Sequence, residues 1–139
     1  MSAALCMAIF MVWGTRASAQ NQEKQPTPEE VASQESERLE RLLKLEDWQV
    51  FYVDSTLQHD FAALDAELKG MQQAKVGNVD LYMEVRDRWM EQVDNSFKKW
   101  FTPAQWEKYL KSGARKAQKD RAKRREKAEK ASRNLSEYK

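Results

Sequence analysis

Apolar residues recur every three or four positions along residues 50–71 of this chain, and polar residues fill most of the positions between them. At 100° per residue these positions fall within a stripe about 80° wide, which is the pattern of an amphipathic helix. Residues 75–78 (KVGN) predict the turn that ends it. The stripe comprises Val50, Val53, Leu57, Phe61, Leu64, Leu68 and Met71.

A second amphipathic pattern follows this turn, in residues 79–100. Asn78 can cap the predicted helix, and Asp80 lies in its first turn. Because a short connection joins two helices of similar length, we expect an antiparallel hairpin roughly 35 Å long. The apolar positions of the second helix are Tyr82, Val85, Trp89, Val93, Phe97 and Trp100.

Another helix is predicted ahead of this hairpin. Thr27 suits the N-cap, Pro28 suits the first helical position, and Glu30 completes a capping box with Thr27. No Gly or Pro divides this helix from the one that contains residues 50–71, so the pattern leaves open whether the two are continuous. Its apolar positions are Val31, Leu39, Leu42 and Leu43.

The segment FTPAQ predicts the start of the last helix. Thr102 is its N-cap and Gln105 is the reciprocal partner of the cap, while Phe101 and Trp106 have the spacing of a hydrophobic staple. We expect Gly113 to weaken this helix only slightly. Beyond residue 117 the chain is rich in Ala, Glu, Lys and Arg, which favours either a solvated helical continuation or a disordered tail.

These patterns predict an all-α fold, an elongated helical hairpin or bundle of three to four helices with a long basic C-terminal helix. The expected organisation is a flexible lead at residues 20–26, a helical domain at 27–117 and a basic tail at 118–139. No alternation typical of strands and no glycine-rich loop occurs.

The first 19 residues have the character of a secretory signal peptide rather than of the domain. Residues 3–13 form an uncharged apolar run, too short to span a bilayer at about 20 residues per spanning helix. Small residues at Ala17 and Ala19 fit a cleavage site before Gln20, although an apolar core helix is the alternative. The single cysteine, Cys6, lies inside this run. We therefore expect a periplasmic or secreted protein without disulfides.

Charge divides the mature part of the chain into two halves. Residues 20–97 hold 17 acidic and 8 basic side chains, whereas residues 98–139 hold 5 and 15. Such asymmetry is typical of an interaction tail or of an internal docking contact. A solvated terminus is the simplest interpretation, and an anionic membrane surface or acidic protein is the alternative partner. Because an exported protein meets little intracellular nucleic acid, we do not expect a nucleic-acid partner. The tail residues are Arg115, Lys116, Lys119, Arg121, Lys123, Arg124, Arg125 and Lys127.

Little in the chain suggests catalysis. His59 is the only histidine, and we expect a surface or packing role for it, with its side chain pointing away from that of Asp60. The sequence offers no thiol nucleophile in the mature part, no metal-ligand spacing and no phosphate-binding loop. We therefore expect no enzyme activity, no cofactor and no metal centre.

Five carboxylates share one face of the helix predicted at 79–100, opposite its apolar stripe. A solvated face is the simplest interpretation. The alternatives are a docking site for the basic tail, from the same chain or a second subunit, and loose binding of hard cations. These residues are Asp80, Glu84, Asp87, Glu91 and Asp94.

Aromatic residues also lie off the main apolar stripes. Trp48, Phe51 and Tyr52 fall on the opposite side of their helix from Val50. One interpretation is that the helix before them covers this side with its leucines. The other is an exposed patch for a client protein or a second protomer, because large exposed apolar patches mark contact sites. The candidate contact residues are Trp48, Phe51, Tyr52, Trp89 and Trp100.

Two short segments carry a family resemblance. Leu45-Glu46-Asp47-Trp48-Gln49 and Phe101-Thr102-Pro103-Ala104-Gln105 resemble the paired LTxxQ motifs of the Spy/CpxP-like periplasmic proteins, with Glu for Thr in the first and Phe for Leu in the second. The resemblance covers roughly residues 39–110. It implies an elongated helical protein, often a cradle-shaped homodimer, that acts as an ATP-independent chaperone or envelope-stress regulator. The motif residues are Leu45, Gln49, Phe101, Thr102 and Gln105.

The functional expectation is therefore an exported protein without enzymatic activity that binds unfolded or envelope proteins through apolar and aromatic side chains. The alternative is a structural or adaptor protein of the cell envelope that attaches through its basic tail to an anionic surface or an acidic partner.

Overall fold

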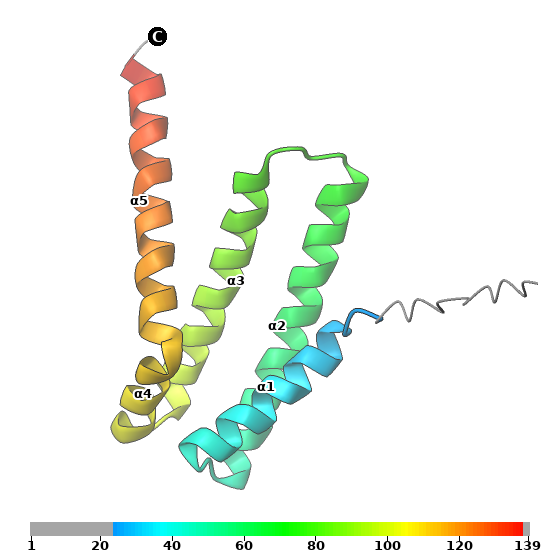
Figure 1. The fold of residues 1–139 in the computed structure, drawn as a ribbon, viewed down its shortest axis with the longest axis vertical. Helices are drawn as coiled ribbons and strands as arrows, with labels where there is room; N and C mark the ends of the chain where they lie inside the picture. The colour runs from blue at the N-terminus through cyan, green and yellow to red at the C-terminus, as the bar shows by residue number, and fades with distance from the viewer. Residues whose placement is uncertain (1–23, 138–139) are drawn as a thin grey trace, which may run out of the picture.

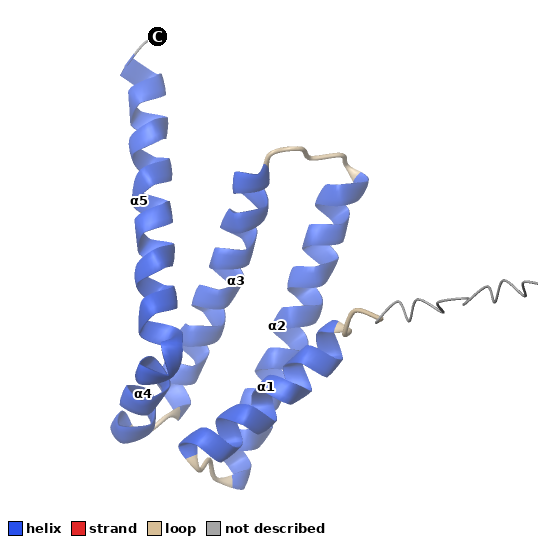
Figure 2. Ribbon diagram, in the orientation of Figure 1, coloured by secondary structure: helices blue, strands red, loops and turns tan. Residues whose placement is uncertain are grey.

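The computed structural model describes residues 24–137 and folds them entirely into helices and short connections, with no strand in this range (Figures 1 and 2). This confirms the all-α prediction. The expected signal peptide and most of the expected lead lie outside the described residues. The helices are α1 (Pro28–Leu43), α2 (Asp47–Gln73), α3 (Val79–Trp100), α4 (Pro103–Tyr109) and α5 (Arg115–Glu137), with a π-helical turn (Leu110–Ala114) between the last two.

The first two helices are separate. At the start of α1 the Thr27 backbone N–H donates to Glu30 Oε2 (2.9 Å), and the Glu30 N–H donates to Thr27 Oγ1 (3.2 Å), as the capping box predicts. At its end Lys44 adopts a left-handed conformation with φ 51° and ψ 56°. Glycine usually takes this position. Because a lysine does so here, no residue pattern predicted the break.

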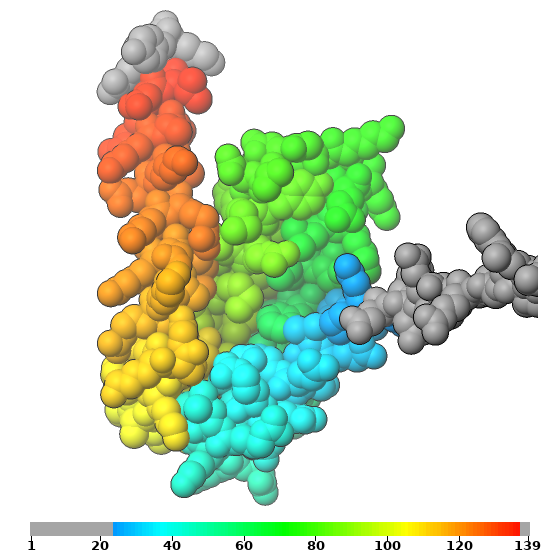
Figure 3. Space-filling model, in the orientation of Figure 1, coloured from blue at the N-terminus to red at the C-terminus, as the bar shows by residue number. Residues whose placement is uncertain are grey.

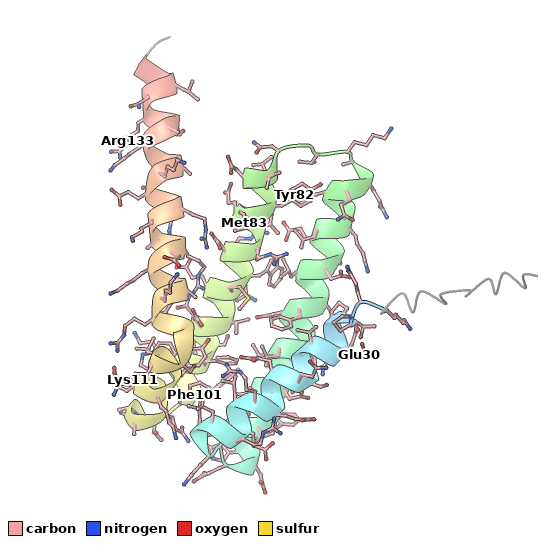
Figure 4. The ribbon with its side chains drawn as sticks, in the orientation of Figure 1. Glu30, Tyr82, Met83, Phe101, Lys111 and Arg133 are labelled. Atoms are coloured by element: carbon pink, nitrogen blue, oxygen red, sulfur yellow. The ribbon has the colours of Figure 1, made fainter. Side chains whose placement is uncertain are left out.

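The two longest helices, α2 and α3, form the predicted antiparallel hairpin (Figure 1). At 1.5 Å per residue, the 27 residues of α2 extend about 40 Å. The turn is fastened at two points. The Asn78 side chain accepts the Asp80 N–H at 2.9 Å, and the Tyr82 hydroxyl donates to the Val76 carbonyl at 2.8 Å. Tyr82 lies between the two helices at this end of the hairpin (Figure 4).

The core lies at the opposite end, where α1, α4 and the base of the hairpin meet. Phe97 is at its centre, and its ring stacks on Phe101 at 5.2 Å and meets Tyr109 edge-on at 5.6 Å. Toward the turn, the apolar side chains between α2 and α3 are half-buried, and Val79, Leu81 and Met83 are exposed. The buried apolar residues are Ala32, Leu39, Leu43, Val53, Leu57, Val93, Phe97, Phe101 and Tyr109.

The last predicted helix is broken at Gly113, which corrects the expectation of a slight weakening. Gly113 has φ 120° and ψ −18°, outside the helical region. Residues with a side chain rarely adopt this φ, so glycine permits the kink. The kink turns the chain from short α4 at the base into α5, which runs back beside α3 (Figure 1).

The basic tail is helical as far as the structure describes it, since residues 118–137 belong to α5. The part of α5 near Arg133 extends past the hairpin turn (Figures 3 and 4). Among residues 24–137 there is no helix with the length and hydropathy that a bilayer span requires.

Candidate functional site

Three aromatic side chains at the start of α2 are exposed to solvent. Trp48 is 49% exposed, Phe51 66% and Tyr52 46%. The Tyr52 ring contacts both of the others edge-on, with centroids 6.4 Å from Trp48 and 5.5 Å from Phe51. The interpretation that α1 covers this side of α2 is therefore wrong. The leucines of α1 point into the core instead, where Leu39 and Leu43 are buried.

The exposed rings rest on the end of α3. Tyr52 stacks on Trp100 with a centroid distance of 5.2 Å and an interplanar angle of 28°. Trp100 is half-buried and packs against the core on its other side. We call Trp48, Phe51, Tyr52 and Trp100 the aromatic patch.

Trp89, the fifth candidate contact residue, lies apart from this patch. It precedes Trp100 by 11 positions on α3, which is about 16 Å along the helix axis. It is half-buried in the hairpin, and its indole Nε1 donates to Glu67 Oε2 at 2.8 Å. This hydrogen bond, together with those from Arg88, lowers the pKa of the Glu67 carboxyl. Trp89 therefore joins α2 to α3.

Two glutamine side chains hold the helix ends behind the aromatic patch. Gln49 Nε2 donates to Gln105 Oε1 at 2.7 Å, and Gln105 Nε2 donates to Gln49 Oε1 at 3.1 Å. Gln49 is only 2% exposed and also donates to the Trp100 carbonyl at 2.9 Å. We call Gln49 and Gln105 the amide pair. It ties the first turn of α2 to the end of α3 and the first turn of α4.

Both sequence motifs place their glutamine in the same way. Gln49 Oε1 accepts the backbone N–H of Glu46, and Gln105 Oε1 accepts that of Thr102, each at 3.0 Å. Thr102 also caps α4 by accepting the Gln105 N–H at 3.2 Å. In the first motif, Glu46 stands where Thr is typical and is the N-cap of α2, and its carboxylate accepts the indole N–H of Trp48 at 2.6 Å. This contact orients one ring of the aromatic patch.

The first residues of the motifs face the core. Phe101 is 7% exposed and Leu45 packs against the core from the loop between α1 and α2. The five motif residues therefore lie together at the base of the hairpin, although the two segments are far apart in the chain.

A second polar cluster centres on Asp94 of α3, which is 7% exposed. Its Oδ1 accepts the Tyr109 hydroxyl at 2.6 Å, and its Oδ2 accepts from Gln118 at 3.1 Å and forms an ion pair with Arg121. Burial, with a further contribution from the Asp94 charge, raises the pKa of Tyr109 far above its ordinary value. Asp94 therefore joins α3, α4 and α5 through one carboxylate.

Two further ion pairs lie above Asp94 along α3. Arg124 donates to both carboxylate oxygens of Asp87, at 2.7 and 2.8 Å, and Arg125 lies 3.3 Å from Glu91. The Asp87 contact raises the pKa of Arg124. For these carboxylates the solvated-face interpretation is wrong, because the basic tail of the same chain docks on them. Only Asp80 and Glu84 of the five are exposed without an ion pair to the described residues.

The other tail residues form no ion pair with α3. Arg115 pairs with Glu107 at 3.0 Å, and Lys116 pairs with Asp120 at 2.7 Å, one turn along α5. Lys119, Lys123 and Lys127 are exposed and have no ion pair within the described part of the chain. The tail thus contains a bound arginine set and a solvent-facing lysine set.

The prediction that the His59 side chain points away from that of Asp60 is wrong, because His59 Nδ1 lies 2.8 Å from Asp60 Oδ1. Asp60 is 3% exposed, and the same oxygen accepts from Gln92 at 3.2 Å. The helical pattern alone does not indicate a buried carboxylate at this position. In residues 24–137 no group of three or more His, Cys, Asp or Glu side chains is placed to hold a metal ion.

No family model, no curated protein and no solved structure matches this chain. The site must therefore be interpreted from its own geometry.

Proposed function

We propose that this chain is an exported protein without enzymatic activity that binds unfolded or partially folded proteins, as an ATP-independent chaperone or envelope-stress regulator of Spy/CpxP-like type. The observation that carries the proposal is the exposure of Trp48, Phe51 and Tyr52 in one contiguous group. The contact residues would be these three and Trp100, while Trp89 would join the two helices of the hairpin.

The chemistry of the aromatic patch suits transient contact with apolar segments. Tryptophan and tyrosine bury a large area on contact and lose little side-chain entropy, and they are enriched where proteins bind one another. Stacking on Trp100 and the bond from Trp48 to Glu46 hold two of the rings in place before a client arrives. A client then gains apolar burial without having to order these side chains.

Charge near the patch would act at longer range. Asp47 lies beside it at the start of α2 and Lys98 and Lys99 lie near the end of α3, all of them exposed. Charged groups around an apolar contact raise the association rate more than the affinity, and salt weakens this effect. The proposal therefore includes salt-dependent capture of clients followed by apolar retention.

The resemblance to the LTxxQ family supports the same function. Both motifs place a glutamine at the third helical position, and the two glutamines meet in the amide pair. Equivalent geometry at both copies is what a repeated motif would produce, despite the exchange of Thr for Glu46.

Aggregation suppression tests the proposal. A chemically unfolded client would be diluted into buffer with stoichiometric amounts of this protein and without ATP, and light scattering would be followed at two salt concentrations. The test variant is Trp48→Ser with Phe51→Ser. The matched control is Val79→Ser with Leu135→Ser, because these exposed apolar residues, at 72% and 73%, lie outside the aromatic patch.

We expect the wild-type protein and the control to suppress scattering and the test variant to lose most of this effect. Circular dichroism of both variants would establish that the fold is retained. Absence of suppression by the wild-type protein at either salt concentration, or equal loss in test and control variants, would overturn the proposal.

A further inference from the structure

The lysines of α5 and the three arginines that contact α3 occupy opposite sides of this helix. At about 100° per residue, its five lysines fall within an arc of about 80°, whereas the three arginines that contact α3 are centred on the other side of the helix. We call these lysines the lysine stripe. Its members are Lys116, Lys119, Lys123, Lys127 and Lys130.

The arginine side of α5 is already engaged. Arg121, Arg124 and Arg125 pair with Asp94, Asp87 and Glu91 of α3. These contacts fix the rotation of α5 about its axis, so the lysine stripe faces away from the hairpin. The docking of α5 therefore presents one set of cations to the solvent by binding the other.

No residue outside α5 in the described part of the chain forms an ion pair with the lysine stripe. Lys119, Lys123 and Lys127 have no ion pair there. Lys116 and Lys130 pair only with Asp120 and Glu126, one turn away on α5 itself. Exposed pairs of this kind contribute little and exchange readily for other anions.

We infer that the lysine stripe is a docking surface for a plane of anionic lipid headgroups. From Lys116 to Lys130 the stripe extends about 21 Å along a straight helix, so all five ammonium groups can reach one flat surface together. The upper part of α5 stands clear of the hairpin, which leaves room for such a surface (Figure 3). This inference does not depend on the proposed chaperone function.

The composition of α5 favours attachment by charge without insertion. Leu135 is the only large apolar residue between Arg115 and Glu137, and no aromatic residue occurs there. Insertion of an amphipathic helix requires a broad apolar face, which α5 lacks. Nucleic-acid recognition on single strands uses aromatic stacking, which α5 also lacks. Three of its five arginines, the residues suited to bidentate phosphate contact, are bound to α3.

Vesicle binding by the full chain tests the inference. Vesicles of phosphatidylcholine alone and of phosphatidylcholine with phosphatidylglycerol would be compared by co-sedimentation at low and at physiological salt. The test variant is Lys119→Gln, Lys123→Gln and Lys127→Gln. The control removes the same charge elsewhere through Lys75→Gln, Lys99→Gln and Lys108→Gln, all exposed and outside α5.

We expect the wild-type protein and the control to bind the anionic vesicles. The test variant should bind them about 100-fold more weakly, from the attraction that each lysine near an anionic surface contributes. All three proteins carry the same N-terminal apolar run, so their difference isolates the lysine stripe.

Four outcomes would overturn the inference. These are absence of wild-type binding to anionic vesicles, equal binding to neutral vesicles, equal weakening in test and control variants, and displacement by millimolar inorganic phosphate at constant ionic strength. Displacement by phosphate would mean that the lysines bind free phosphate rather than a lipid surface. Stripe-dependent binding of duplex DNA without binding to vesicles would likewise assign the lysines to nucleic acid.

Discussion

The side-chain amides of Gln49 and Gln105 donate hydrogen bonds to each other, at 2.7 and 3.1 Å, across a sequence separation of 56 residues. Each glutamine also accepts the N–H of its own N-cap residue. A local capping interaction and a long-range contact therefore use the same two side chains. A shift of the start of α2 relative to α4 would break the hydrogen bonds between the two amides.

Replacement of Gln49 by alanine should destabilise the fold by about 2 kcal/mol, because it removes a buried side chain and leaves the part-buried Trp100 carbonyl and Glu46 N–H without their partner. Urea unfolding would measure this loss. Gln34→Ala, at an exposed position on α1, should change stability by less than about 0.5 kcal/mol. Similar values for the two variants would contradict a structural role for the amide pair.

The reciprocal hydrogen bonds between the two amides also predict that Gln49 and Gln105 contribute to stability in a coupled way. In a double-mutant cycle, Gln49→Ala and Gln105→Ala should be non-additive by at least about 0.5 kcal/mol, because each single variant already removes the shared hydrogen bonds. Additive losses would mean that each glutamine acts only on its own helix.

Replacement of Asp94 by asparagine should loosen α5. Arg121 would lose its ion-pair partner while it remains largely buried, at an expected cost of about 2 kcal/mol. Amide hydrogen exchange in α5 should then accelerate relative to exchange in α2. Glu84→Gln, on the exposed part of the same face, is the matched control and should leave this exchange unchanged. Unchanged protection in the Asp94 variant would contradict the docking contact.

We expect the free energy of unfolding to decline at alkaline pH because of Tyr109. Its pKa is raised in the folded state by burial and by the neighbouring Asp94 charge. The unfolded chain therefore loses this proton first as the pH rises above about 10, and the stability that the protonated phenol contributes is lost with further increase in pH. Unfolding free energies of the wild-type protein should decline across this range.

Tyr109→Phe provides the control for this pH dependence. It should be less stable at neutral pH, because the hydrogen bond to Asp94 is lost, but its alkaline decline should be shallower. Parallel pH profiles in the two proteins would assign the decline to other groups.

Two glycines predict opposite responses to the same substitution. Gly70→Ala, at a helical position with open space around it, should stabilise by about 0.5 kcal/mol. Gly113→Ala should destabilise by about 1 kcal/mol or more, because φ 120° strains any residue with a Cβ. Thermal unfolding of both variants would show the difference in sign. Stabilisation by Gly113→Ala would mean that the kink is not required.

Local patterns in the sequence predicted the two longest helices and three helix starts of this fold. Apolar spacing predicted α2 and α3, and the capping residues Thr27, Asn78 and Thr102 marked helix starts, because both depend on neighbours within one helical turn. The break at Lys44 and the kink at Gly113 escaped this approach. Each depends on a left-handed or otherwise unusual backbone conformation that the surrounding packing selects.

The residue pattern alone was thus enough to predict the all-α class, the hairpin and the division into an acidic body and a basic tail. Which charges meet and which face the solvent depended on how the helices pack against one another. Arg121, Arg124 and Arg125 of α5 bind α3 and the lysines of α5 do not, because the kink at Gly113 sets the direction of α5 and the buried Asp94 sets its rotation. The exposure of Phe51 was decided in the same way. A helical pattern places a residue on one side of its own helix, but only packing determines whether another helix covers that side.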